Sequence, residues 1–258
     1  MSDPQIQHLN PQPEPPGSPV MSTAQTLTSI FFEPGETFKA LRVRPRFLIA
    51  GILTLLVFMG YYTAFVGRVG SENIARAAIL QRNPDATPEQ IEQGMRIQTS
   101  PVIKVITYVS FPVIFGILFA AGAGLYLLGT TLMGKAITFK QALSVWVYSS
   151  YPPTVVYALV NVLALFLKPA DDIDPMSLNT GVAHANLSIL LDPKKQPVLA
   201  TVLNSFDLIV FFGLFLAALG LKTMAKLSSG SAWAIVLTIW VVGLILRVVM
   251  ATIFGQAY

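Results

Sequence analysis

Five long apolar segments constrain this chain of 258 residues more than any other feature of its sequence. They lie at about 47–66, 105–133, 142–167, 203–221 and 233–254. Each is long enough to cross a hydrocarbon layer of ~30 Å as a helix. A helix pairs its own backbone N–H and C=O groups, which lipid cannot do. The segments therefore predict an all-α, polytopic membrane protein, a five-helix transmembrane bundle with short interfacial helices.

The composition agrees with a membrane protein and excludes several kinds of site. Charged residues make up 12% of the chain and hydrophobic residues 53%, whereas soluble domains carry roughly 25% charged residues. The absence of cysteine excludes disulfides, thiolate metal sites and cysteine nucleophiles. The two histidines, His8 and His184, lie far apart in the sequence. We therefore predict no metal site and no cofactor.

The sequence does not favour an enzyme or a nucleic-acid-binding protein. A membrane enzyme needs a base, a nucleophile or a metal at matched depth, and none of the apolar segments contains a histidine. The formal net charge is +4 and the pI about 9.3. The basic residues, however, gather beside the apolar segments, which is the pattern that membrane topology produces. The expected partner is the lipid bilayer, with other membrane proteins or a second copy of the chain as further possibilities.

The N-terminal part divides into a tail and an amphipathic segment. Residues 1–21 contain six prolines and few apolar residues, which predicts a disordered tail, and residues 22–258 then form one membrane domain. Residues 22–46 carry apolar side chains at helical spacing and end in a basic cluster. The cluster consists of Lys39, Arg42, Arg44 and Arg46. Such a segment would lie in the headgroup plane, with the cations on lipid phosphates; a topology signal without regulatory meaning is the interpretation we prefer.

Two further patterns predict local structure. Between the first two spans, residues 71–82 have one apolar helical face, and Thr87-Pro88-Glu89-Gln90 matches a capping box, so two short helices are expected. In the second span, Gly116, Ala120 and Gly124 recur at every fourth position, with the small residues Ala121, Gly122 and Ala123 between them. Small residues at this spacing predict close packing between helices.

The third span contains adjacent prolines near its middle. A proline lacks the N–H group and its ring clashes with the carbonyl four residues back, so the carbonyls of Tyr148 and Ser149 lose their helical donors. The prolines lie ~16 Å from the start of the span at ~1.5 Å per residue, which predicts a helix broken at mid-membrane. The break would be either a packing kink or the lining of a binding site. Its candidate residues are Tyr148, Ser149, Tyr151, Pro152, Pro153 and Asn161.

The fourth and fifth spans each carry one charge, Asp207 and Arg247. A short loop joins these spans, so they are antiparallel and the two charges fall at similar depth. An isolated charge in lipid is costly, which predicts an ion pair. The pair would be a structural clamp or, in a small transporter or channel that also uses the broken third span, a gate.

The basic residues also predict the orientation. The cations of the N-terminal flank and of the two short loops lie directly against the spans, whereas several on the other side lie deep in long loops. The positive-inside rule gives more weight to cations close to a span. We therefore expect the N-terminus in the cytoplasm and the C-terminus outside, in a bacterial inner membrane.

Three segments resemble the Yip-type (Ypt/Rab-interacting protein) membrane domain family. They are residues 30–38 with Arg44-Pro45-Arg46, residues 134–156 and residues 206–237. The resemblance covers about 22–254 and implies five spans and a cytoplasmic N-terminus.

Eukaryotic members of that family are named for binding Rab/Ypt GTPases and work in vesicle traffic. This chain lacks their long cytoplasmic region and their Asp-Leu-Tyr motif and resembles the prokaryotic branch, so Rab binding is not implied. The compact bundle, the interfacial N-terminal segment and the absence of a catalytic constellation favour a non-enzymatic protein of membrane organisation or scaffolding, whose specific activity is unsettled.

Overall fold

The computed structural model describes residues 21–178, 180–183, 191 and 195–255. All regular structure in these residues is helical, which confirms the predicted all-α class. The helices are α1 (Thr23–Ser29), α2 (Pro34–Val43), α3 (Leu48–Val69), α4 (Ser71–Arg82), α5 (Pro88–Gln98), α6 (Pro101–Leu132), α7 (Phe139–Leu167), the short 3-10 helix η1 (Ala170–Asp172), α8 (Pro197–Asn204), α9 (Leu208–Ala225) and α10 (Ser229–Phe254). Five of them, α3, α6, α7, α9 and α10, are long and apolar enough to cross a membrane. The predicted tail falls almost entirely outside the described residues.

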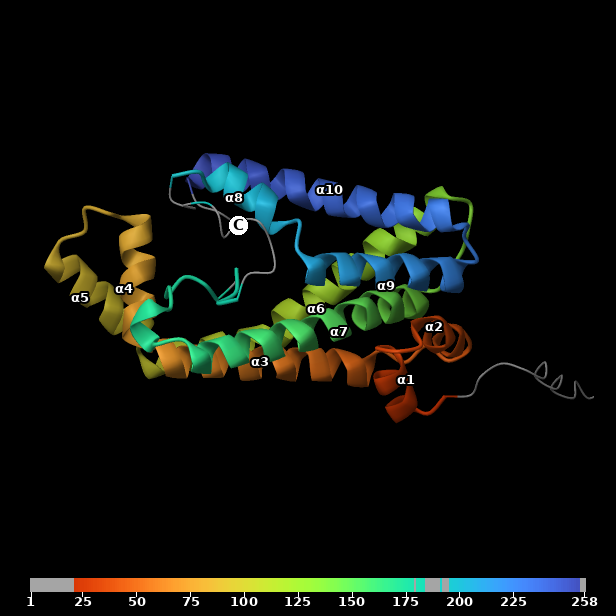
Figure 1. Cartoon of the computed structure of the whole chain (residues 1–258), viewed down its shortest axis with the longest axis horizontal. Coiled ribbons are helices and arrows are strands. Elements are labelled where there is room, and N and C mark those ends of the chain that lie inside the picture. The colour runs from red at the N-terminus through yellow and green to blue at the C-terminus, as the bar shows by residue number, and fades with distance from the viewer. Residues whose placement is uncertain (1–20, 179, 184–190, 192–194, 256–258) are drawn as a thin grey trace, which may run out of the picture.

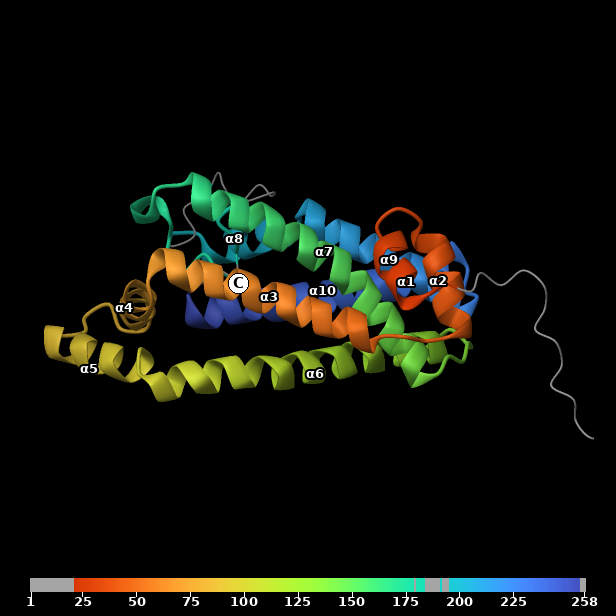
Figure 2. The same cartoon turned by 90° about the horizontal axis from the view of Figure 1, so that it is seen from below.

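The five long helices run along one axis with α7 in contact with three of the others, α3, α6 and α9 (Figures 1 and 2). Helix α10 packs against α8 and α9. We call the end that carries α1, α2 and the loops at 133–138 and 226–228 the N-terminal end (Figure 1). The opposite end, with α4, α5 and the loop at 168–183, is the far end.

Short polar caps set where several helices begin. Thr87 accepts a hydrogen bond from the N–H of Gln90, whose side chain accepts one from the N–H of Thr87, so the predicted capping box is confirmed. The same reciprocal box, Thr138 with Gln141, starts α7. Each box satisfies two N–H groups that the first helical turn leaves unpaired. The chain thus switches from loop to helix at defined residues.

The apolar core is divided between the two ends. At the N-terminal end, Ile30, Phe38 and Leu41 from the α1–α2 region are fully buried together with residues of α7 and α9 such as Val145 and Leu221. At the far end, a second cluster joins α3, α7 and the loop after α7. Its fully or nearly fully buried members are Tyr61, Phe65, Val69, Ala158, Leu165, Ile173 and Val182.

Helix α7 runs without interruption through Pro152 and Pro153, so the prediction of a broken third span is wrong. Hydroxyl groups support the backbone on both sides of the prolines. Ser149 and Ser150 donate to the carbonyl of Trp146 at 3.0 and 2.8 Å. Thr154 donates to the carbonyl of Ser150 at 2.8 Å. These bonds end on the carbonyls of Trp146 and Ser150, not on those of Tyr148 and Ser149, which the prolines leave without helical donors.

The neighbouring helix also accommodates the prolines. A β-carbon at Gly213 of α9 would lie 3.4 Å from the ring of Pro153 and 3.6 Å from the carbonyl oxygen of Ser149. Helix α9 therefore approaches α7 closely at a residue without a side chain. The two prolines alone predict an interruption, but in the structure α7 is continuous and α9 packs closely against it at this point.

The interruption lies instead in the fourth segment. The sequence predicted one span at 203–221, but the chain forms α8, leaves the helix at Ser205–Asp207 and begins again with α9. Residues 197–204 form α8 before the turn, and α9, which is long and apolar enough to cross a membrane, corresponds to the predicted span with a start five residues later.

The small residues of α6 act differently from the prediction. A β-carbon at Gly116 or Gly124 would meet nothing within 4 Å among the described residues, and Ala120 is exposed. Close packing is confirmed instead at Gly122, within the predicted row, which lies against the indole of Trp146, and it also occurs at Gly129, where a β-carbon would lie 2.6 Å from Ile235. The predicted stripe faces outward, because the face of α6 that packs on the bundle is the one with Gly122 and Gly129.

Candidate functional site

The strongest candidate for a functional site is the turn between α8 and α9. Asp207 lies at the start of α9, where its Oδ1 accepts a hydrogen bond from the N–H of Ile209 at 2.7 Å. The hydroxyl of Ser205 donates to the carbonyl of Thr201 at the end of α8, at 3.0 Å. An aspartate is among the best N-cap residues, and its negative charge is favourable at a helix N-terminus. The sequence therefore ends one helix and starts the next at these two side chains.

The turn lies beside the middle of α10. The rings of Phe206 and Phe211 contact the indole of Trp240, with centroid distances of 5.3 and 6.1 Å. Trp240 is close to the midpoint of α10, which runs from Ser229 to Phe254. An acidic side chain thus caps a helix partway along the bundle, where non-helical backbone is tolerated only when protein or a water-filled cavity surrounds it.

The predicted ion pair between Asp207 and Arg247 is not formed between these two described residues, and that prediction is wrong. The side chain of Arg247 is exposed. Helix α8 packs along α10 before α9 begins, and the residue beside the start of α9 is Trp240. Trp240 comes seven residues before Arg247, which is ~10 Å along a helix. The prediction had aligned Asp207 with Arg247 because it did not include α8, which lies along α10 before α9 begins.

A second group of polar side chains lies at the far end around Asn161. This residue is 1% exposed, as expected for a buried polar group in the third span. Its Oδ1 accepts hydrogen bonds from the N–H groups of Val182 and Ala183, at 2.7 and 3.0 Å. Its Nδ2 donates to the carbonyl of Tyr157 at 2.9 Å. Asn161 therefore attaches the loop after α7 to the helix itself.

Other contacts hold the same loop. Lys168 Nζ donates to the carbonyl of Val182 at 2.8 Å, and the hydroxyl of Tyr157 donates to the carbonyl of Leu178 at 3.2 Å. Gly181 has φ +91°, and a β-carbon there would lie 3.0 Å from Asn161 Oδ1. Only a glycine fits this backbone at such close approach. A few polar side chains of α7 and of Lys168 thus fix the loop by hydrogen bonds to its backbone.

One hydroxyl in this region has no hydrogen-bond partner among the described residues, that of Tyr61. Its side chain is 2% exposed and its ring packs edge-on against Tyr157 at 5.5 Å. The sequence places Tyr61 near the end of an apolar span without any sign that it is buried. The burial of Tyr61 could not be predicted from the sequence, because it depends on the loop after α7, which folds back over α3 and α7.

The aromatic candidates on α7 face the N-terminal helices. The hydroxyls of Tyr148 and Thr26 lie 2.9 Å apart, and the ring of Tyr151 lies edge-on to Phe31 with centroids 5.6 Å apart. Arg46 Nη1 donates to the hydroxyl of Thr23 at 3.2 Å. The structure therefore does not bring all the predicted site residues together: Tyr148 and Tyr151 contact the N-terminal helices, while Asn161 contacts the far-end loop.

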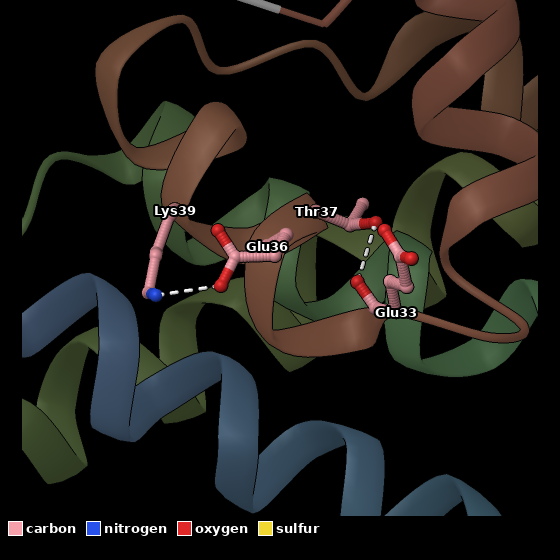
Figure 3. A network of polar contacts seen from close by, with 4 residues as sticks. All are labelled: Glu33, Glu36, Thr37 and Lys39. Carbon is pink, nitrogen blue, oxygen red and sulfur yellow. Dashed lines mark hydrogen bonds and ion pairs between the residues drawn. The ribbon is translucent and has the colours of Figure 1, made fainter. Parts of the chain in front are cut away.

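The basic cluster lies at the N-terminal end beside α2. Lys39 forms an ion pair with Glu36 at 2.7 Å, and the hydroxyl of Thr37 donates to the carbonyl of Glu33 at 3.1 Å (Figure 3). The Nε2 of Gln141 donates to the carbonyl of Arg42 at 3.1 Å, which joins α7 to the end of α2. In the described part of the chain, no group of three or more acidic or histidine side chains is placed to hold a metal ion.

In comparisons with known proteins, the model of a family described as the Yip1 domain matches residues 28–250. The match runs from α1 into α10 and so includes the turn at Asp207, Asn161 and the basic cluster. Neither the curated proteins nor the solved structures gave a match.

Proposed function

Because the chain belongs to the Yip1-domain family of membrane proteins, we propose that it is a non-enzymatic integral membrane protein that organises the bilayer or acts as a scaffold for membrane partners. We place it in the prokaryotic branch of the family and in a bacterial inner membrane. Its N-terminal end would face the cytoplasm and its C-terminus the outside. Its partners would be lipid and other membrane proteins or further copies of the chain.

The observation that carries this proposal is the use of the polar side chains inside the bundle. Thr54 donates to the carbonyl of Ala50, Ser144 to that of Lys140 and Thr154 to that of Ser150, each at 2.8 Å. Asn161 holds the far-end loop. The hydroxyls are bonded to carbonyls of their own helices, and Asn161 pairs N–H groups of the loop, so these polar groups find their partners within the protein, as lipid requires. They support a structural role better than a passage for a polar substrate.

A small transporter or channel is a second candidate function, and one observation favours it. Asp207 caps a discontinuous helix beside the middle of α10. Discontinuous helices and intramembrane acids mark binding sites in many transporters. Of the original grounds for this alternative, the broken third span and the Asp207–Arg247 pair are both absent from the described structure. The turn at Asp207 replaces them.

Reconstitution tests the two functions against each other. The purified full chain would be placed in liposomes, and ion and proton flux would be measured together with vesicle shape by electron cryomicroscopy. An organising protein is expected to change vesicle size or curvature without flux above that of empty liposomes. If ion or proton flux were observed and Asp207→Asn abolished it, the proposal would be wrong and the chain would be a transporter or channel. Crosslinking in native membranes would then identify the neighbouring proteins.

A further inference from the structure

The two ends of the bundle differ in charge. The N-terminal end has eight cations, Lys39, Arg42, Arg44, Arg46, Lys135, Lys140, Lys222 and Lys226. It has two acids in its described residues, Glu33 and Glu36. The described residues of the far end have seven cations, Arg68, Arg76, Arg82, Arg96, Lys104, Lys168 and Lys195. They are matched by seven acids, Glu72, Asp85, Glu89, Glu92, Asp171, Asp172 and Asp174. Only the N-terminal end therefore produces a strong positive potential.

Helix α2 carries part of this charge on a rigid base. It lies across the end of the bundle (Figure 2), where Phe38 and Leu41 are fully buried. A β-carbon at Gly220 of α9 would lie 2.9 Å from Phe38, so the helix is seated closely on α9. Lys39 is exposed, and Arg42, four residues after Phe38, is half-buried at the edge of the packed face of α2. The apolar face is used for packing, and cations remain on the surface.

The turn between α1 and α2 exposes one large apolar side chain. Phe31 packs on Tyr151, but Phe32 beside it is 86% exposed. A β-carbon at Gly51 of α3 would lie 3.8 Å from Val147, and Tyr151 is one helical turn further into the bundle. Phe32 is therefore level with the membrane-spanning helices rather than beyond them. In a bilayer that these helices cross, an exposed side chain at that level would contact acyl chains.

We propose that the N-terminal end binds anionic phospholipids, with its cations on the headgroup phosphates and Phe32 among the acyl chains. Cations above and an aromatic ring below the headgroup level are the two parts of an interfacial lipid site. The inference rests on the proposed bilayer-organising function and names its lipid class. The net positive charge of this end argues for anionic over zwitterionic lipid.

Native mass spectrometry of the purified full chain tests the charge. The protein would be equilibrated with equal phosphatidylglycerol and phosphatidylcholine, and the retained lipids counted. We expect enrichment of phosphatidylglycerol, lowered at least ~5-fold by the triple change Arg42→Gln, Lys140→Gln and Lys222→Gln, because each cation near an anionic surface contributes ~1 kcal/mol. The matched triple at the far end, Arg76→Gln, Arg82→Gln and Lys104→Gln, is expected to keep the enrichment.

Equal retention of the two lipids by the unchanged protein, or equal losses in both triples, would overturn the inference. The inference would also be overturned if the N-terminal triple lost an acidic protein partner while lipid retention stayed the same. If the liposomes showed ion or proton flux while phosphatidylglycerol was still enriched, the proposed function would be contradicted but the lipid-binding inference would stand. If vesicle shape changed without enrichment of phosphatidylglycerol, the lipid-binding inference would be contradicted but the proposed function would stand.

A spin label tests the position of Phe32. The chain has no cysteine, so Phe32→Cys gives a single labelling site, and Lys226→Cys gives a control site at the same end. In vesicles that contain phosphatidylglycerol, the label at 32 is expected to be relaxed by oxygen and protected from a water-soluble nickel complex. The label at 226 is expected to show the reverse. A label at 32 as accessible to nickel as the one at 226 would contradict the inference.

Discussion

The two ends of the bundle are closed by different kinds of contact. At the N-terminal end, α2 covers the helices with fully buried apolar side chains such as Phe38 and Leu41. At the far end, the loop after α7 buries two apolar side chains, Ile173 and Val182, and is held in addition through hydrogen bonds to its backbone from Asn161, Lys168 and Tyr157. Apolar packing distributes the stabilising free energy over many contacts, whereas the hydrogen bonds of the far-end loop concentrate it in a few atoms. The far end should therefore be the more sensitive to a single substitution.

Asn161→Leu should have the largest effect. It removes the acceptor for the buried N–H groups of Val182 and Ala183, and each buried group left unsatisfied costs roughly 1–3 kcal/mol. We expect a loss of about 4 kcal/mol in the free energy of unfolding, measured in mixed micelles, and faster amide exchange at 180–183. Asn161→Asp keeps an acceptor oxygen and should lose less. Equal losses would mean that the two N–H contacts do not hold the loop.

Phe38→Ala should come next. Truncation of a fully buried phenylalanine costs about 3–5 kcal/mol in a water-soluble core, and detergent around α2 lowers this to about 3 kcal/mol. Increased proteolysis of the α1–α2 region, with α3–α10 unchanged, is the expected readout. Phe32→Ala, on the exposed neighbour, is the control and should leave proteolysis unchanged. Unfolding of the far end in Phe38→Ala would contradict the separation of the two cores.

Gly220→Ala tests how closely α2 is seated. The added methyl group would lie 2.8 Å from Val145 and 2.9 Å from Phe38. Overpacking of this kind costs typically 1–3 kcal/mol, so we expect a loss of about 2 kcal/mol by thermal unfolding in detergent. Gly116→Ala on α6 adds the same group where nothing lies within 4 Å in the described structure. A loss in Gly116→Ala as large as in Gly220→Ala would show that a partner covers that face.

Asp207→Ala should have the smallest effect on stability among these changes. Loss of an N-cap costs roughly 1 kcal/mol, and asparagine caps almost as well as aspartate. Asp207→Asn should therefore be close to neutral in thermal unfolding. Because Asp207 and Arg247 do not pair in the described structure, the losses of Asp207→Ala and Arg247→Ala should add within ~0.5 kcal/mol. A larger coupling would place the two charges in contact.

Hydrophobic length and local capping were the features that the sequence predicted well. Each of the five predicted spans overlaps one long apolar helix, and the box at Thr87–Gln90 starts α5 as expected. Both signals lie within one segment. They need no knowledge of how the segments pack.

The errors arise where packing decides between local alternatives. Pro152 and Pro153 are strong local breakers, but α7 continues through them, and α9 packs closely against them at Gly213. The turn at Asp207 carries no proline, and its cap is visible only once α8 is known to precede it. Asn161 was expected to be buried, but its partners lie in a loop without periodicity. Contacts between distant segments cannot be predicted from periodicity.

Helix α6 has a consequence for the membrane in which the chain resides. It has 32 residues, so it is ~48 Å long at ~1.5 Å per residue, against a hydrocarbon thickness of ~30 Å. Such a helix either leans over or stands out of the bilayer, and each ångström of mismatch costs a fraction of a kcal/mol. Thicker regions of membrane should therefore attract this chain, and thinner ones should force the helix to lean further.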